Sequence, residues 1–141
     1  MNNLFLQDQP LWKTNDYWTY AERQNRIYPE HTLRGGKWLI FVSNFYVNRI
    51  WGKIKIATEG GKLGGMSKVA TSKPNPDFQN SKIKVICVYT YDWKDEVDVK
   101  RIRSELRNIG ITRKISYKAD EDTDQGKYRI NSSEKLSKYY E

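Results

Sequence analysis

The feature that most constrains this chain is a pair of glycines followed at once by an apolar run. Gly35-Gly36 leads directly into Lys37-Trp38-Leu39-Ile40-Phe41-Val42. Glycine tolerates the backbone angles that tight turns require, and a short apolar run directly after a turn is typical of a buried strand. The chain therefore passes from an exposed loop into its core within a few residues. We expect a strand from Lys37 to Ser43.

Further segments have the composition of strands. Met66–Thr71 predicts a second strand, Ile83–Tyr91 has the strongest strand pattern in the chain, and Arg113–Lys118 predicts a fourth strand. A short additional strand is expected at Tyr128–Ile130.

Two segments repeat apolar residues every three or four positions, which is the period of a helix with one buried face. The first spans residues 47–58 and ends at Gly60-Gly61, and the second follows Asp95, a good N-cap, and stops at Gly110. A shorter helix is predicted over residues 14–23. The outer face of the second long helix is predicted to be basic, through Lys100, Arg101, Arg103 and Arg107.

Charge and aromatic content indicate a class of ligand. The chain has 25 Lys and Arg residues against 17 Asp and Glu, a formal net charge of +8, which favours anionic partners such as nucleic acid or nucleotides. Aromatic residues make up 13% of the chain, including 5 Trp and 10 Tyr. Rings and cations together are what a site needs to stack a base and hold its phosphate, although the same rings could instead fill a core.

Cysteine usage and hydropathy indicate the compartment. Cys87 is the only cysteine, so no disulfide forms within the chain. It lies in the apolar segment 83–91, where a small buried side chain is favoured over a nucleophile. No apolar run reaches the roughly 20 residues that span a bilayer, and Met1–Pro10 lacks the order of a secretory signal. We expect a cytoplasmic protein without membrane contact.

Three blocks of sequence carry a resemblance to a known family. They are Gly36–Val42 with Val47 and Trp51; Lys62-Leu63-Gly64 with Ser67–Thr71; and Lys84–Asp92 with Asp98-Val99, Ser116–Asp120, Thr123 and Gly126-Lys127-Tyr128. Together they resemble the basophilic leukaemia expressed protein family, some members of which are labelled phosphothreonine lyase domain proteins. That family has the mRNA cap-binding, translation initiation factor 4E-like fold.

The resemblance implies an α+β fold, with a single curved, mainly antiparallel sheet and helices packed on one face. The alternation of expected strands and helices indicates the same class. We expect one domain over residues 1–141. Within it we expect an N-terminal helix and loop region at 1–33, a family-like core at 34–128 and a C-terminal tail at 129–141.

The match to the true cap-binding proteins is narrower. Those proteins sandwich methylguanine between two Trp residues on loops, one of them followed by an acidic residue. The loop before the glycine pair, Ile27–Leu33, contains Tyr28 and Glu30 but no Trp. The resemblance to classical cap binding therefore stops at the fold.

Lys68 is the first candidate for contact with a ligand. Strand alternation places it on the opposite face from Ser67, Val69 and Thr71, where its amine could meet a phosphate. The alternative is a charge that protects a sheet edge from aggregation. The full set of candidate ligand-binding residues is Lys62, Lys68, Tyr89, Tyr91, Trp93, Tyr117, Lys118, Asp120 and Thr123.

Tyr117-Lys118-Ala119-Asp120, with Thr123 three residues on, is a comparable cluster. Lys118 could hold a phosphate, Tyr117 could stack on a base, and Asp120 could orient a ribose hydroxyl. Equally, the segment could be a strand end that runs into an Asx-type turn.

Tyr89, Tyr91 and Trp93 alternate along one strand and its exit, as a core stripe or a stacking platform would. The glycine-rich segment 60–65 lacks the Gly-Lys-Ser/Thr ending of a Walker loop, but Lys62 could reach a phosphate from it.

His31 is the only histidine, and no metal-ligand spacing or Ser-His-Asp arrangement is present. No metal or cofactor is therefore expected. If the protein is an enzyme, His31 with Lys68 or Lys118 would supply the acid and base.

The leading hypothesis is a binding module that holds a phosphorylated nucleotide, or a nucleotide-derived signal, between aromatic rings and basic side chains. In a viral setting such a module would sequester an immune signal. The first alternative is a metal-independent lyase or phosphodiesterase acting on a phosphate ester of a nucleotide or of phosphothreonine. The second is non-specific RNA or DNA binding through the basic helix face and Arg113-Lys114. We expect Lys68 and Lys118 to converge on the concave face of the sheet with Tyr89, Tyr91 or Tyr117.

Overall fold

The computed structural model describes residues 9–24, 27–74, 82–121 and 137–141. Within them, one six-stranded sheet has the order β1-β3-β4-β2-β5-β6. Its members are β1 (Trp18–Glu22), β2 (Gly36–Ser43), β3 (Met66–Ala70), β4 (Ile83–Thr90), β5 (Ser116–Ala119) and β6 (Ser137–Tyr140), and the helices are α2 (Val47–Glu59) and α3 (Glu96–Ile109).

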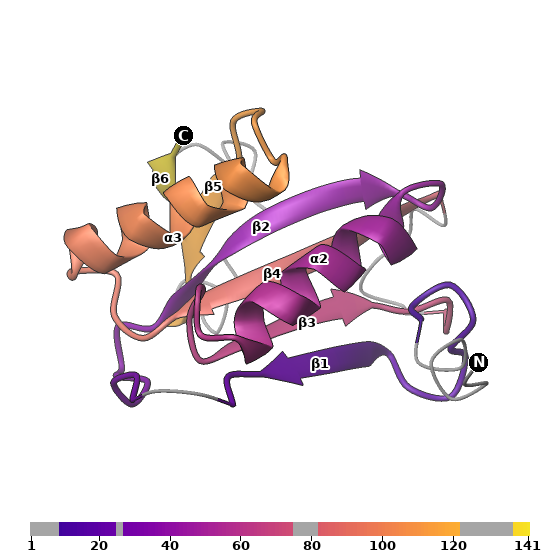
Figure 1. Cartoon of the computed structure of the whole chain (residues 1–141), viewed down its shortest axis with the longest axis horizontal. Helices are drawn as coiled ribbons and strands as arrows, with labels where there is room; N and C mark the ends of the chain where they lie inside the picture. Colours follow the sequence, from indigo (N-terminus) through magenta and orange to yellow (C-terminus); the bar gives the residue numbers. More distant parts are fainter. Residues whose placement is uncertain (1–8, 25–26, 75–81, 122–136) are drawn as a thin grey trace.

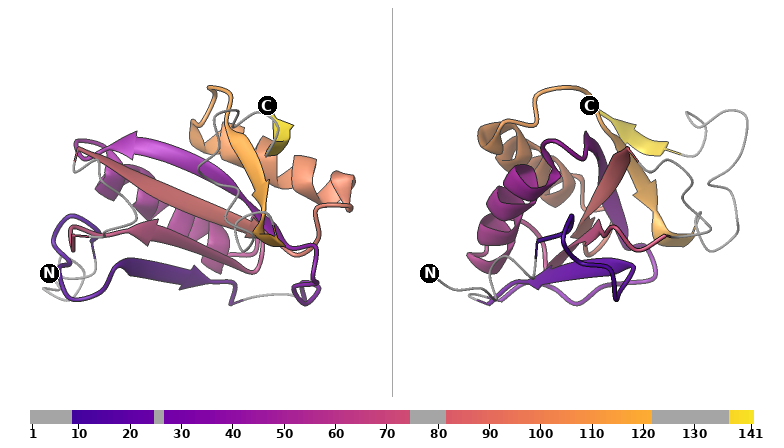
Figure 2. Two further views of the ribbon diagram at one scale, coloured as in Figure 1. Left: turned by 180° about the vertical axis from the view of Figure 1, so that it is seen from behind. Right: turned by 90° about the vertical axis from the view of Figure 1, so that its right-hand side faces the viewer.

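The sheet is curved, and each pair of neighbouring strands is antiparallel. Both helices pack on the same face of it, as the view close to its edge makes clear (Figures 1 and 2). This arrangement confirms the α+β class and the single curved sheet expected from the sequence.

β2 divides its side chains between the two faces of the sheet. Trp38, Ile40 and Val42 are buried beneath the helices, whereas Lys37 and Phe41 point to the other face. The buried set forms the core with residues from β3, β4 and both helices. The alternation follows from the two-residue period of a strand, so the Gly-Gly-to-apolar pattern predicted this element correctly.

The structure confirms both long helices and the positions at which they end. Asp95 caps α3 by accepting a hydrogen bond from the Asp98 amide at 3.1 Å, and Gly110 ends the helix with a φ of 119°. Only glycine adopts that left-handed angle without strain, which is why the helix stops there. In α2, Val47, Trp51 and Ile54 lie on the buried face, as the periodicity predicted.

The predicted helix over residues 14–23 is wrong, because Trp18–Glu22 form strand β1. Trp, Thr and Tyr favour strands, and β1 pairs with β3 from Trp18↔Ala70 to Glu22↔Met66. Polar residues before the segment mimic a helix cap, but sheet pairing decided the outcome.

At the other end of the chain, the fourth predicted strand begins at Ser116 rather than Arg113. The tail predicted at 129–141 contains β6, which pairs with β5. The strand predicted at Tyr128–Ile130 lies outside the described residues.

Arg103 corrects the predicted basic face of α3. Its side chain is fully buried, and its guanidinium donates to three backbone oxygens: those of Ile111 at 2.9 Å, Arg113 at 2.7 Å and Glu141 at 2.9 Å. Burial lowers the pKa of Arg103, because a charge is held away from water. Arg103 therefore joins the segments before β5 and after β6 to the helix, and it is not available to an external ligand.

Candidate functional site

The sheet face opposite α2 and α3, called the open face below, collects basic and aromatic side chains from five strands. Register sets this arrangement: Lys37 lies opposite both Tyr89 and Lys118, and Lys68 lies opposite Cys87, two residues before Tyr89 on the same face. β1 adds two rings, because Tyr20 lies opposite Lys68. The open-face cluster is Trp18, Tyr20, Lys37, Lys68, Tyr89 and Lys118.

Lys68 lies between two of these rings. Its Nζ atom is 3.8 Å from the centroid of the Trp18 ring and 5.9 Å from that of Tyr89. The side chain is half-buried, and this burial lowers the pKa of Lys68. An ammonium held between rings and partly removed from water is a strong position for contact with an anion.

Asp120 links Lys37 and His31 at the edge of the cluster. Its carboxylate accepts from Lys37 Nζ at 2.7 Å and contacts His31 Nε2 at 2.8 Å. The His31 and Tyr89 rings meet edge to face, with centroids 6.1 Å apart. His31 and Lys68 therefore approach Tyr89 from different elements, one from a loop and one from β3.

A cleft of about 370 Å³ adjoins the open-face cluster, shares Tyr89 with it and is also lined by His31. Tyr28 is held in its wall, since its hydroxyl donates to Asp98 at 2.5 Å and accepts from the Tyr91 amide at 3.2 Å. The cleft is lined by Tyr28, Pro29, His31, Gly65, Met66, Tyr89, Thr90 and Tyr91. Its size and aromatic lining suit a small planar ligand.

The loop that carries His31 is fixed to the end of β4. Arg34 makes two hydrogen bonds to Asp92, at 2.9 and 2.6 Å, and the backbone adds Thr32 N to Tyr91 O and Trp93 N to Arg34 O. The hydrogen bonds from Arg34 hold the pKa of Asp92 below its usual range. Contacts within the protein therefore hold this wall of the cleft in place.

Asp92 gives the protein a predicted sensitivity to acid. A carboxyl group whose pKa is lowered on folding stabilises the fold above its unfolded pKa of about 3.9, and the contribution is lost as the pH falls through the folded value. Asp92→Asn is expected to lower the melting temperature by several degrees at pH 7, and the gap to wild type should close below about pH 4. A gap that stays constant from pH 7 to pH 3 would show that the ion pair does not contribute.

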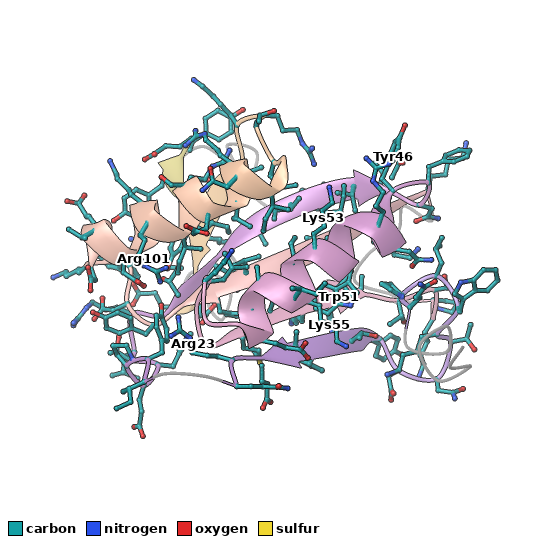
Figure 3. The ribbon with its side chains drawn as sticks, viewed as in Figure 1. Arg23, Tyr46, Trp51, Lys53, Lys55 and Arg101 are labelled. Atoms are coloured by element: carbon teal, nitrogen blue, oxygen red, sulfur yellow. The ribbon has the colours of Figure 1, made fainter. Side chains whose placement is uncertain are left out.

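The loop that carries Lys62 is held in place by two arginines. Arg23 donates to the carbonyls of Leu63 and Gly64, and Arg101 to those of Lys62 and Leu63. Figure 3 shows Arg23 and Arg101 approaching this end of the molecule from separate elements. Lys62 itself is exposed.

The remaining predicted residues fall into three groups. Tyr117 is fully buried on the helix side, where it packs edge to face against Trp38 and bonds to Thr90 Oγ1 at 2.6 Å, so it faces away from the open-face cluster. Tyr91 lines the cleft, and Trp93 packs half-buried against the core. Thr123 lies outside the described residues.

Three members of the open-face cluster, Trp18, Tyr20 and Lys37, were not predicted from the sequence. Lys37 could have been found from alternation, since it precedes the inward-facing Trp38 by one residue. Trp18 could not, because residues 14–23 were interpreted as a helix. Cys87 is buried, as expected, and burial raises its pKa to about 11.

Two classes of feature are absent from the described part of the chain. It has no group of three or more His, Cys, Asp or Glu side chains that could hold a metal ion. Nor do its helices include one that is both long and apolar enough to cross a bilayer.

The fold of this chain is similar to that of several eIF4E proteins of known structure. The structure is similar to schistosome eIF4E complexed with m7GpppA and 4E-BP, with a TM-score of 0.59, 14% identity and coverage of 77% of this chain and 59% of that one. It is also similar to Ascaris suum eIF4E-3 with m7G cap, with a TM-score of 0.57, 18% identity and coverage of 92% and 72%. The structure is similar as well to C. elegans eIF4E-3 in complex with Mextli and a cap analog, with a TM-score of 0.56, 18% identity and coverage of 77% of this chain and 65% of that one.

The chain thus spans about three-fifths of the length of the schistosome protein and 65% of the C. elegans one. Within this fold class, residues 23–124 match the family described as Basophilic leukemia-expressed protein Bles03. The match covers well over half of the 141 residues, and the chain belongs to that family.

Proposed function

We propose that this protein is a binding module for a phosphorylated nucleotide or a nucleotide-derived signal. The observation that carries the proposal is the convergence of Lys37, Lys68 and Lys118 with Trp18 and Tyr89 on one sheet face, beside a cleft of about 370 Å³. The lysines would hold the phosphates by charge-assisted hydrogen bonds, and the base would stack in the aromatic cleft.

Proteins of the same fold support this choice of ligand class. The schistosome and Ascaris suum structures contain m7GpppA and m7G cap, which are phosphorylated nucleotides. At 14–18% identity the likeness concerns the fold, so the ligand class is argued from this chain's own side chains. Holding a ligand without cleaving it also suits the sequestration of a signalling nucleotide.

The first test is calorimetric titration with mono-, di-, tri- and cyclic nucleotides at low salt. Lys68→Ala and Lys118→Ala are each expected to weaken binding by about 1.5–3 kcal/mol, the contribution of a hydrogen bond to a charged group, or roughly 10- to 150-fold. Lys53→Ala removes the same charge from an exposed position on α2 and should leave affinity unchanged (Figure 3). The absence of detectable binding for every nucleotide of the panel would refute the proposal, as would wild-type affinity in a Lys68/Lys118 double variant.

One observation favours a second candidate, a metal-independent enzyme acting on a phosphate ester. His31 contacts Asp120 at 2.8 Å, as a base held by an orienting carboxylate would, and Lys68 Nζ lies 5.9 Å from the centroid of the Tyr89 ring that His31 also contacts. Incubation of bound nucleotides with protein and chelator, followed by chromatography, separates the two candidates. Recovery of unchanged nucleotide supports binding, and products lost in His31→Ala would support the enzyme.

A further inference from the structure

Three aromatic rings around the site, of Trp18, Tyr28 and Tyr89, have cations of the protein near their faces. Lys68 lies 3.8 Å from the Trp18 centroid, Lys37 and Lys68 lie 5.8 and 5.9 Å from that of Tyr89, and Arg23 lies 4.6 Å from that of Tyr28. Ring faces attract positive charge through their quadrupole, and here the protein's own side chains supply it.

Two carboxylates near the cleft, of Asp120 and Asp98, already have partners within the protein. Asp120 is shared between Lys37 at 2.7 Å and His31 at 2.8 Å. Asp98, behind Tyr28, accepts from that tyrosine at 2.5 Å and from Arg101 at 2.9 Å. Neither carboxylate is left to balance a positive charge brought by a ligand.

These two observations bear on which base the cleft admits. A neutral base stacks on rings of any kind because it has a π-face of its own. A base with a fixed positive charge, such as 7-methylguanine, would meet Lys37, Lys68 and Arg23 at the same rings, and like charges at these distances repel. The phosphates, by contrast, would be attracted by the same lysines.

We infer that this site selects nucleotides with an uncharged base and excludes those whose base carries a fixed positive charge, including the 7-methylguanine of mRNA caps. The inference rests on the proposed function, since it concerns the ligand of the same site. It narrows the ligand class to nucleotides with a neutral base, recognised by the negative charge of their phosphates and by an uncharged ring.

The test compares three triphosphates that differ only at position 7 of the base: GTP, 7-methyl-GTP and 7-methyl-7-deaza-GTP. The last has the methyl group without the positive charge. Calorimetry at one fixed salt concentration should give at least about fivefold weaker binding for 7-methyl-GTP than for GTP. The deaza analogue should bind within about twofold of GTP, because it lacks the repelled charge. ATP and 1-methyl-ATP, whose base is also cationic at neutral pH, form a second pair.

Equal or tighter binding of the cationic nucleotide in both pairs would overturn the inference and leave the proposed function intact. Equal exclusion of 7-methyl-7-deaza-GTP would also overturn it, since shape and not charge would then be the cause. If none of the nucleotides binds detectably, both the proposed function and the inference are refuted.

A matched pair of variants tests the source of the selectivity. Lys68→Gln should weaken GTP binding more than 7-methyl-GTP binding. The dissociation constant of 7-methyl-GTP divided by that of GTP should therefore fall by at least about half. Lys53→Gln, with the same loss of charge on exposed α2, should leave the ratio as in wild type (Figure 3). An unchanged ratio in Lys68→Gln would show that Lys68 does not set the selectivity.

Discussion

Replacing Arg103 with methionine is expected to lower the free energy of unfolding by about 3–4 kcal/mol, although methionine fills much of the same space. The loss arises because the backbone oxygens of Ile111 and Arg113 lose the Arg103 donor, whereas the oxygen of Glu141 keeps its hydrogen bond from the Ile115 amide at 2.8 Å. A buried acceptor left without a partner costs about 1–3 kcal/mol, and release of the buried charge offsets part of the sum. Urea unfolding followed by tryptophan fluorescence measures the effect.

Arg107→Met is the matched control, because Arg107 lies exposed one turn along the same helix. Its effect should stay within about 0.5 kcal/mol, as for ordinary surface substitutions. Hydrogen exchange adds a local readout: the Arg103 variant should lose protection in β6, which Arg103 joins to the helix through Glu141. Equal stability of the two variants would show that the three contacts of Arg103 are dispensable.

Gly64→Ala is expected to destabilise the fold by about 3 kcal/mol and to distort the cleft. A Cβ atom at Gly64 would lie 2.0 Å from the carbonyl oxygen of Tyr89, which is backbone and has little freedom to move away. Overpacking of this kind costs about 1–3 kcal/mol, and a clash with backbone belongs at the upper end. Because Tyr89 belongs to both the cleft and the open-face cluster, nucleotide binding should weaken as well.

The neighbouring residue supplies the control. A Cβ atom at Gly65 would come no closer than 3.5 Å to the ring of Tyr28, which is ordinary contact. Gly65→Ala should therefore change the free energy of unfolding by less than about 1 kcal/mol. Thermal melts and nucleotide titrations of the two variants check the pair, and a Gly64→Ala protein with wild-type stability and affinity would contradict the close packing of this loop against β4.

Local pattern predicted much of the fold. β2, α2, β4 and α3 were predicted within a residue or two, since β2 and the two helices each bury one face with a clear period, and β4 is a mostly apolar run that is buried on both faces. The ends of α3 were predicted because Asp95 and Gly110 have intrinsic roles at helix termini. β1 was missed because a five-residue segment takes its conformation from its partner strand, and that partner, β3, lies more than 40 residues away in the chain.

The candidate site was predictable only in part. Lys68, Lys118 and Tyr89 were identified from strand alternation, which reports the face on which a side chain lies. Tyr117 was grouped with Lys118 as one sequence cluster, but neighbouring residues of a strand point to opposite faces, and Tyr117 lies in the core. Arg103 shows a further limit, because a charged side chain becomes a core residue when three chain segments turn their carbonyls toward it.

The sequence by itself therefore determined the strands and helices with strong periods, the helix ends and the basic and aromatic character of the site. Those properties depend on each residue and its close neighbours in the chain. Only the tertiary structure decided that Asp120 lies between His31 and Lys37, that Lys68 lies on Trp18, and that cations occupy the rings of the site. These contacts join residues 50 to 89 positions apart, and strand register and loop packing, which no local pattern encodes, bring them together.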